Sequence, residues 1–171
     1  MQEIKGDLFS YIGTADAICI TTNGFVKSNG EAVMGKGCAK KATELWPGVA
    51  KFLGDSLKAD GNTVIPLFSV NGTTVCSFPV KPVSESFDGT NAVRHMASKF
   101  NIGDRVPGWA CKARTDIINV SAISLCRIAD INHWKQIVLP RPGCGAGELC
   151  WSRIKPILDK HLDDRFYSIT Y

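Results

Sequence analysis

The feature that most constrains the fold is a pair of glycine-rich loops, each lying between a strand-like run and a helical pattern. The first loop, Met34–Ala39, comes after the apolar run Ala15–Thr22, and the second, Pro142–Glu148, directly follows the short apolar run Gln136–Pro140. A nearly continuous apolar run is typical of a strand buried on both faces of a parallel sheet. Glycine lets a ligand approach the backbone, and the amides at a helix start carry partial positive charge. The pattern therefore predicts two anion-binding loops that would hold one diphosphate from both sides.

The rest of the chain continues the alternation of strands and helices. Further strands are expected at Ile4–Phe9, Thr63–Val70, Thr73–Val80 and Phe166–Tyr171, and helices at Lys36–Leu45, Val49–Leu57, Asp116–Ala129 and Trp151–Leu162. Asn71-Gly72 predicts a hairpin between two of these strands. Residues 87–101 have a partly helical pattern, and residues 103–109 are rich in turn residues and are expected to form a surface excursion. The predicted fold is a three-layer α/β/α sandwich with a mixed, largely parallel central sheet.

Length and composition narrow the class of protein. The 171 residues fit one domain, 1–171, and no run is long enough to span a membrane. The N-terminus lacks the pattern of a secretory signal, so a cytoplasmic location is expected. The seven cysteines form no Cys-x-x-Cys pair, which argues against a disulfide framework and against a metal site. The net charge of +4, with its lysines and arginines scattered, suits a small anionic ligand and is weak support for nucleic acid binding.

The type of phosphate site is also constrained by what is missing. No Gly-x-Gly-x-x-Gly follows the first strand, and no Gly-x-x-x-x-Gly-Lys-Ser/Thr occurs. These absences exclude a dinucleotide-binding Rossmann fingerprint and a P-loop. In open α/β sheets, ligands bind beyond the carboxyl ends of the strands, which is where both glycine loops are expected.

Taken together, these segments resemble a macrodomain, the ADP-ribose-binding α/β/α fold. The matching segments are Gly6–Phe9, Thr21–Asn23, Met34–Ala39, Ser77–Lys81 and Leu139–Gly145, followed by Leu149-Cys150-Trp151, in the order of the family and over nearly the whole chain. The resemblance is greatest to the branch with the ADP-ribosyl glycohydrolases and antitoxin macrodomains that act on DNA, and to the ADP-ribose 1''-phosphate phosphatases. It implies ADP-ribose or a derivative as ligand, no cofactor and no metal.

The resemblance assigns the ligand-binding residues. Asp7 would accept the exocyclic amine of adenine, with Leu8 beside it and Tyr171 flanking the base; the alternative for Asp7 is a helix or turn cap. Asn23 would bind the distal ribose, and its alternative is an Asn-Gly turn. The phosphate loops would contribute the remaining set: Gly35, Lys36, Gly37, Cys38, Gly143, Cys144, Gly145, Ala146 and Gly147. Of these, Lys36 is second in rank because it could equally be solvated, and the two cysteines are interpreted as packing residues.

Two positions depart from the family's catalytic pattern. Counting from Gly35 places Thr43 where some glycohydrolases have an adduct-forming lysine, and Gly147 stands where its partner aspartate would be. Glu148 is the nearest acid and is a candidate general base, with a solvated loop carboxylate as the alternative; Glu31 is a weaker candidate. Asn23 is included with Glu148 in the expected catalytic set.

The expected function is hydrolysis of a group on the distal ribose, either as a phosphatase or in de-ADP-ribosylation. The alternative is a non-catalytic binder of ADP-ribose, of ADP-ribosylated partners or of a related nucleotide signal. ADP-ribosylated protein or nucleic acid are the macromolecular partners considered. The chain is expected to be a monomer without membrane association.

Overall fold

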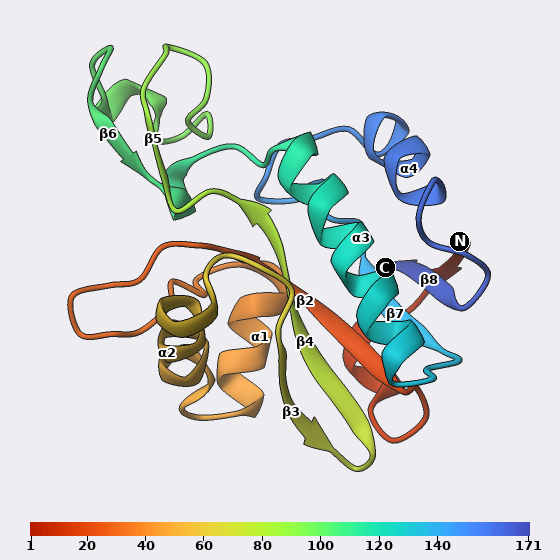
Figure 1. Ribbon diagram of the computed structural model, residues 1–171. Helices are drawn as coiled ribbons and strands as arrows, with labels where there is room; N and C mark the ends of the chain where they lie inside the picture. Colours follow the sequence, from red (N-terminus) through yellow and green to blue (C-terminus); the bar gives the residue numbers. More distant parts are fainter.

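The two glycine loops follow β2 (Ala17–Asn23) and β7 (Ile137–Pro140), which are neighbouring parallel strands in the middle of a sheet. The computed structural model describes residues 1–171. Figure 1 shows this sheet between helices on its two faces. The carboxyl ends of β2 and β7 lie at the same edge, so both loops leave the sheet on the same side. The predicted α/β/α sandwich is confirmed.

The central sheet has six strands in the order β1-β8-β7-β2-β4-β3. The remaining members are β1 (Gln2–Lys5), β3 (Pro66–Val70), β4 (Thr73–Lys81) and β8 (Phe166–Thr170). All neighbours pair in parallel except β3 and β4, which are antiparallel. Asn71 and Gly72 join this pair with φ values of 49° and 83°, the left-handed backbone that a tight hairpin requires. The predicted hairpin is confirmed.

Strand side chains alternate between two apolar cores. Ala17 and Cys19 of β2 pack with α3 (Thr115–Ile131) and α4 (Trp151–Asp159), whereas Ile18 and Ile20 pack on the opposite face. That second face is covered by α1 (Gly37–Leu45) and α2 (Val49–Asp60). Because successive residues of a strand point to opposite faces, a strand that is apolar at every position needs a helical layer on each side.

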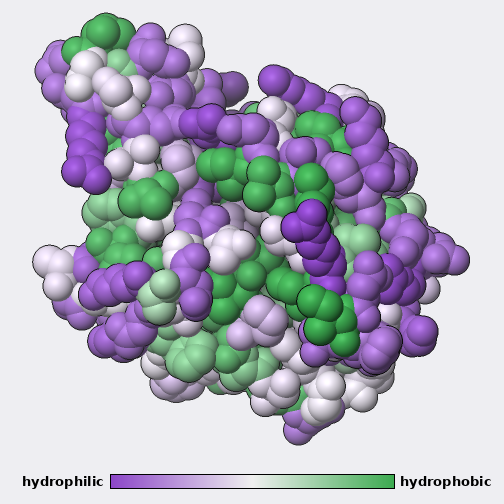
Figure 2. Space-filling view, in the orientation of Figure 1, coloured by the Kyte–Doolittle hydropathy of each residue, from purple (hydrophilic) through white to green (hydrophobic).

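The outer surface carries some apolar residues along α3. Figure 2 shows green, apolar residues over this helix, and Val120 and Ile131 are 59% and 76% exposed. No helix combines the length and the apolar character needed to cross a membrane. All seven cysteines are free thiols.

Several expected boundaries need correction. The strand expected at Ile4–Phe9 ends at Lys5, because Gly6 turns the chain with a φ of 145° and Asp7 caps the 3-10 helix Leu8–Tyr11. Helix α4 ends at Asp159, three residues before the expected Leu162. Strand β3 starts at Pro66 rather than Thr63.

The segment between β4 and α3 forms a small lobe, defined here as residues 84–111. It contains the antiparallel pair β5 (Ser84–Ser86) and β6 (Arg105–Pro107), and short 3-10 turns at Ala97–Lys99 and Gly108–Ala110. Of the partly helical pattern expected at 87–101, the structure has the 3-10 turn Ala97–Lys99, and the rest is mostly irregular chain. The excursion expected at 103–109 is part of this lobe, which stands apart from the main sheet in Figure 1.

Candidate functional site

A large cavity lies where the carboxyl ends of β2, β4, β7 and β8 meet. Its volume is about 820 Å³, and residues from both glycine loops line it together with the ends of these strands. A volume of this size falls within the range typical of sites for small molecules and cofactors. The two loops therefore face one shared space, as the sequence pattern predicted.

Most of the predicted site residues line this cavity. They are Leu8, Asn23, Gly35, Lys36, Gly37, Cys38, Gly143, Cys144, Gly145, Ala146, Gly147 and Tyr171. Asp7 and Glu148 do not line it, although their neighbours Gly6, Leu8, Gly147 and Leu149 do. The fold thus brings the predicted residues to one place, with the two acidic residues just outside the lining.

Gly35 and Gly145 differ from every other glycine in the chain. A Cβ added at either position would meet no atom within 4 Å, and neither residue has the left-handed φ that favours glycine. Neither packing nor backbone conformation therefore explains why these residues are glycine. Both line the cavity, one from each loop. A ligand that approaches the backbone at both positions explains the two glycines.

Gly143 and Gly147 are required by packing instead. A Cβ at Gly147 would lie 2.6 Å from the carbonyl oxygen of Gly143 and 2.6 Å from the Cβ of Ala113. At Gly143, which has a φ of 74°, it would lie 2.9 Å from the same Ala113 Cβ. These glycines let the second loop fold tightly against the start of α3.

Asn23 closes the first loop while it lines the cavity. Its Nδ2 donates to the carbonyl oxygen of Val33 over 2.9 Å, and its Oδ1 accepts from the amide of Phe25 over 3.0 Å. The turn interpretation of Asn23 thus has direct support. One N–H and one lone pair of the amide remain for a ligand.

The cysteines of the cavity behave as packing residues. Burial raises the pKa of Cys144 to about 11, so that its thiol stays protonated at neutral pH. The Sγ of Cys38 accepts from the amide of Thr21 over 3.4 Å, which fixes α1 against the end of β2. This geometry agrees with the packing interpretation for both residues.

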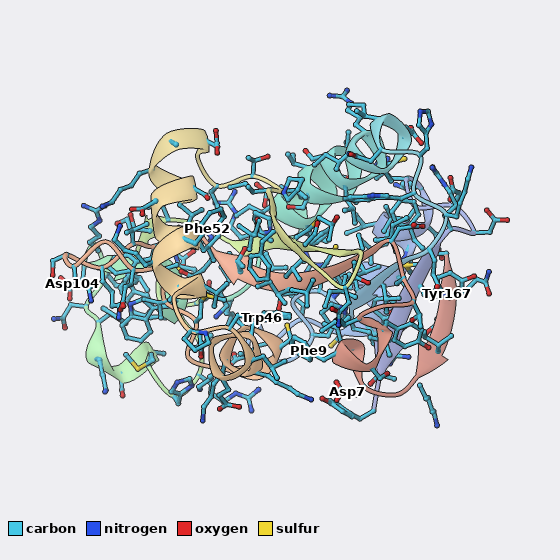
Figure 3. All side chains as sticks on the ribbon, turned by 90° about the horizontal axis from the view of Figure 1, so that it is seen from below. Asp7, Phe9, Trp46, Phe52, Asp104 and Tyr167 are labelled. Atoms are coloured by element: carbon cyan, nitrogen blue, oxygen red, sulfur yellow. The ribbon has the colours of Figure 1, made fainter.

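Asp7 forms a cap and an ion pair at the far end of the cavity from the lobe. Its Oδ1 accepts from the amide of Phe9 over 3.1 Å, and its Oδ2 accepts from Nζ of Lys41 over 2.5 Å. The hydrogen bond from Lys41 is the main reason why the pKa of Asp7 is lowered. Figure 3 shows Asp7 beside Phe9 and far from Asp104, which belongs to the lobe.

Lys81 lines the cavity and was not among the site residues expected from the sequence. It is the last residue of β4, pairs in register with Asn23 and lines the cavity, yet it is only 8% exposed. Its Nζ donates to the carbonyl oxygen of Trp109 over 3.2 Å. Burial lowers the pKa of Lys81 from 10.5 to about 8. A lysine at the carboxyl end of a buried strand is a signal that could have identified it.

The charged residues in the lining are all cationic. Besides Lys81 they are Lys36, Lys41 and Arg141, and no Asp or Glu lines the cavity. Positive charge in a partly enclosed site attracts an anionic ligand. This composition suits a diphosphate.

The other catalytic candidates lie outside this arrangement. Thr43 does not line the cavity, and its hydroxyl donates to the carbonyl oxygen of Lys40 over 2.7 Å. Glu31 is ion-paired with Lys27 at 2.6 Å on the exposed surface. One carboxylate oxygen of Glu148 accepts from the backbone N–H of Arg94 over 2.8 Å. The general-base role of Glu148 stays a prediction.

No protein-family model and no curated protein sequence matches this chain. Several solved structures are similar to this chain. The macrodomain of DarG from Mycobacterium tuberculosis is similar with a TM-score of 0.69 at 20% identity, over 98% of this chain and 95% of that one. The macrodomain of DarG from Thermus aquaticus is similar with a TM-score of 0.68 at 17% identity, over 99% and 97%. DarTG from Thermosipho africanus, solved in complex with ADP-ribose, gives 0.66 at 16% identity, over 98% of this chain and 41% of that one. The chain therefore has the macrodomain fold.

Proposed function

We propose that the cavity binds ADP-ribose with its diphosphate between the two glycine loops. The observation that carries this proposal is the pair Gly35 and Gly145, whose backbones face open space from opposite loops without any internal reason to be glycine. Main-chain amides at the start of α1 and in the second loop are suited to phosphate oxygens. The similar DarTG structure was solved with this ligand, which supports the choice.

The adenine would lie at the end of the cavity lined by Leu8, Phe9 and Tyr171. Asp7 lies next to this end, and each of its carboxylate oxygens has one hydrogen bond and a lone pair to spare. Asp7 would accept the exocyclic amine of the base from there. The distal ribose would then lie toward Asn23 and Lys81, which are paired in register on β2 and β4.

We further propose that the protein removes the group attached to the distal ribose, and that Lys81 is the nucleophile. At a pKa of about 8, a substantial fraction of this amine is neutral near pH 7.5. A neutral, desolvated lysine amine is an established type of nucleophile toward carbonyl-like carbon. In this proposal the adduct-forming lysine is on β4. It is not at the position of Thr43, which the count from Gly35 had indicated.

The proposed reaction passes through a covalent adduct between the anomeric carbon and Nζ of Lys81. The Nζ lone pair forms a bond to the anomeric carbon, and the bond to the attached group breaks, with its electron pair leaving on that group, which takes a proton. The attached amine then loses a proton, and the bond between the anomeric carbon and the ring oxygen breaks. Its electron pair goes to the ring oxygen, which takes a proton, and an iminium ion is left on Lys81. Water adds to the same carbon and loses a proton, and the carbon–nitrogen bond breaks with its electron pair returning to Nζ. This step releases ADP-ribose and regenerates the amine of Lys81.

Borohydride trapping tests this chemistry. Incubation with an ADP-ribosylated substrate and sodium borohydride should leave ADP-ribose covalently attached to Lys81, detectable by peptide mass spectrometry. Lys81→Met should give no adduct and no turnover, whereas Lys40→Met, which removes an exposed lysine of α1, should behave like wild type. Turnover that persists in Lys81→Met would refute the lysine mechanism.

The second candidate function is that of a non-catalytic binder. It is favoured by Gly147 in place of the expected aspartate and by the absence of any acidic side chain from the lining. The same absence makes a water-activating phosphatase mechanism less well supported than de-ADP-ribosylation, because a general base must lie within hydrogen-bond reach of the water. ADP-ribose binding without turnover of phosphorylated or ADP-ribosylated substrates would establish the binder.

A further inference from the structure

The lobe of residues 84–111 has a small apolar core of its own. Phe87, Ala92, Val106, Ala110 and Cys111 are all buried in this core. Backbone hydrogen bonds join its two halves, including Val93 N–H to Ala110 over 2.8 Å and Gly103 N–H to Phe87 over 2.9 Å. The lobe therefore has a core and a network of backbone hydrogen bonds of its own.

Two consecutive residues of the lobe contact the two glycine loops, one residue to each loop. The backbone N–H of Arg94 donates to Glu148 in the second loop over 2.8 Å. Nε2 of His95 lies 3.3 Å from Nζ of Lys36 in the first loop. Residues 94–95, which we call the strap, therefore bridge the two loops that line the cavity.

The lobe reaches the cavity at the end where Lys81 lies. Trp109 lines the cavity, and its carbonyl oxygen accepts from Nζ of Lys81 over 3.2 Å. A group attached to the anomeric carbon beside Lys81 would therefore point toward the lobe. The opposite end, near Asp7, is distant from it (Figure 3).

The backbone conformation of Glu148 is a second, independent reason to assign a role to its contact with Arg94. Its φ is 61°, a left-handed conformation that few non-glycine residues adopt and that costs free energy for a side chain such as glutamate. A glycine or asparagine would adopt it more readily. A glutamate at this position is explained if its side chain is needed, and the contact it makes is with the strap.

We propose that the lobe determines which attached groups the site accepts, through Trp109 beside Lys81, and that Glu148 is a positioning residue that anchors the lobe to the second loop through the strap. This inference rests on the proposed function. It assigns the exclusion of bulky attached groups at the Lys81 end to the lobe, which reaches the cavity through Trp109; Arg94 and His95 do not line the cavity. It gives Glu148 a role other than that of a general base, and Glu148→Gln separates the two roles, because a base loses its function on conversion to glutamine, whereas an acceptor of one N–H keeps it.

The test compares Glu148→Ala, Glu148→Gln and the control Glu44→Ala, which removes an exposed glutamate of α1. Hydrogen exchange of the Arg94 amide, measured by NMR, reports the anchor directly. We expect exchange at least tenfold faster in Glu148→Ala and near wild type in the other two variants. Unchanged exchange in Glu148→Ala would refute the anchor.

Specificity is measured as the ratio of kcat/KM for an ADP-ribosylated protein to that for ADP-ribose 1''-phosphate. Glu148→Ala should raise this ratio at least tenfold, and Glu148→Gln should leave it unchanged. A ratio that stays constant in Glu148→Ala would overturn the proposal. A loss of turnover in Glu148→Gln would also overturn it, because that loss is expected of a general base. If wild type turns over neither substrate, the proposed function fails, while the exchange of the Arg94 amide still decides whether Glu148 holds the strap.

Discussion

The buried ammonium group of Lys81 should make the folded protein less stable than it would be without it. Burial lowers the pKa of this lysine from 10.5 to about 8. The folded-state pKa is the lower one, so the cost is fully present below pH 8 and disappears as the pH rises toward 10.5. The two values correspond to about 3 kcal/mol of unfolding free energy. A catalytic role would explain why a residue with this cost is kept at the end of a core strand.

The perturbation is Lys81→Met, which keeps a long apolar stem and removes the titrating group. The assay is urea denaturation of both proteins at pH 7 and at pH 10.5. The stability of wild type relative to Lys81→Met should increase by about 3 kcal/mol between these pH values, since all other titrating groups are shared. The variant should also be the more stable protein at pH 7, although the loss of the bond to Trp109 offsets about 1 kcal/mol of the gain. A stability difference that does not change with pH would refute this account of Lys81.

Three further outcomes are expected. The kcat/KM for de-ADP-ribosylation should rise with pH and level off above about pH 8, where Lys81 is deprotonated, and a flat profile would contradict a lysine nucleophile. Gly147→Ala should lower unfolding stability by about 2 kcal/mol or more, because its Cβ would clash with the backbone of Gly143; unchanged thermal unfolding would show that the loop can yield. Asn23→Ala should weaken both ADP-ribose binding and stability, the latter by about 1–2 kcal/mol through the loss of two loop-closing hydrogen bonds, and calorimetry with thermal melts would separate the two effects.

The fold could be predicted from the sequence wherever a residue pattern is compatible with only one local structure. The apolar run of β2 needs a helical layer on each face, and the structure supplies α3 and α4 on one side and α1 and α2 on the other. Asn71-Gly72 fixed the hairpin because both residues tolerate a left-handed backbone. The edge strand β1 was extended too far, because the turn at Gly6 depends on a conformation that a local apolar pattern does not reveal.

Most residues that line the cavity could be predicted from the sequence, but the role of each one was harder to predict. Glycine loops at strand ends indicated where a ligand would bind, but which glycine faces open space depends on neighbours that are distant in sequence, such as Ala113 beside Gly147. The position of Lys81 in the cavity follows from the pairing of β4 with β2, which no count along the chain gives. The surface excursion at 103–109 was predicted, but the strand pair inside the lobe was not, because β5 and β6 are only three residues each.

The most direct test of the central claim is isothermal titration calorimetry with ADP-ribose on wild type and on Gly35→Val. A Cβ added at Gly35 would meet no atom within 4 Å, and Gly35 lines the cavity at the first loop. We expect that wild type binds one ADP-ribose and that Gly35→Val loses at least tenfold in affinity with an unchanged melting temperature. The control Ala59→Val, on the exposed surface of α2, should behave like wild type. Wild type that does not bind ADP-ribose, or Gly35→Val that binds it as well as wild type does, would contradict the placement of the diphosphate between the two glycine loops.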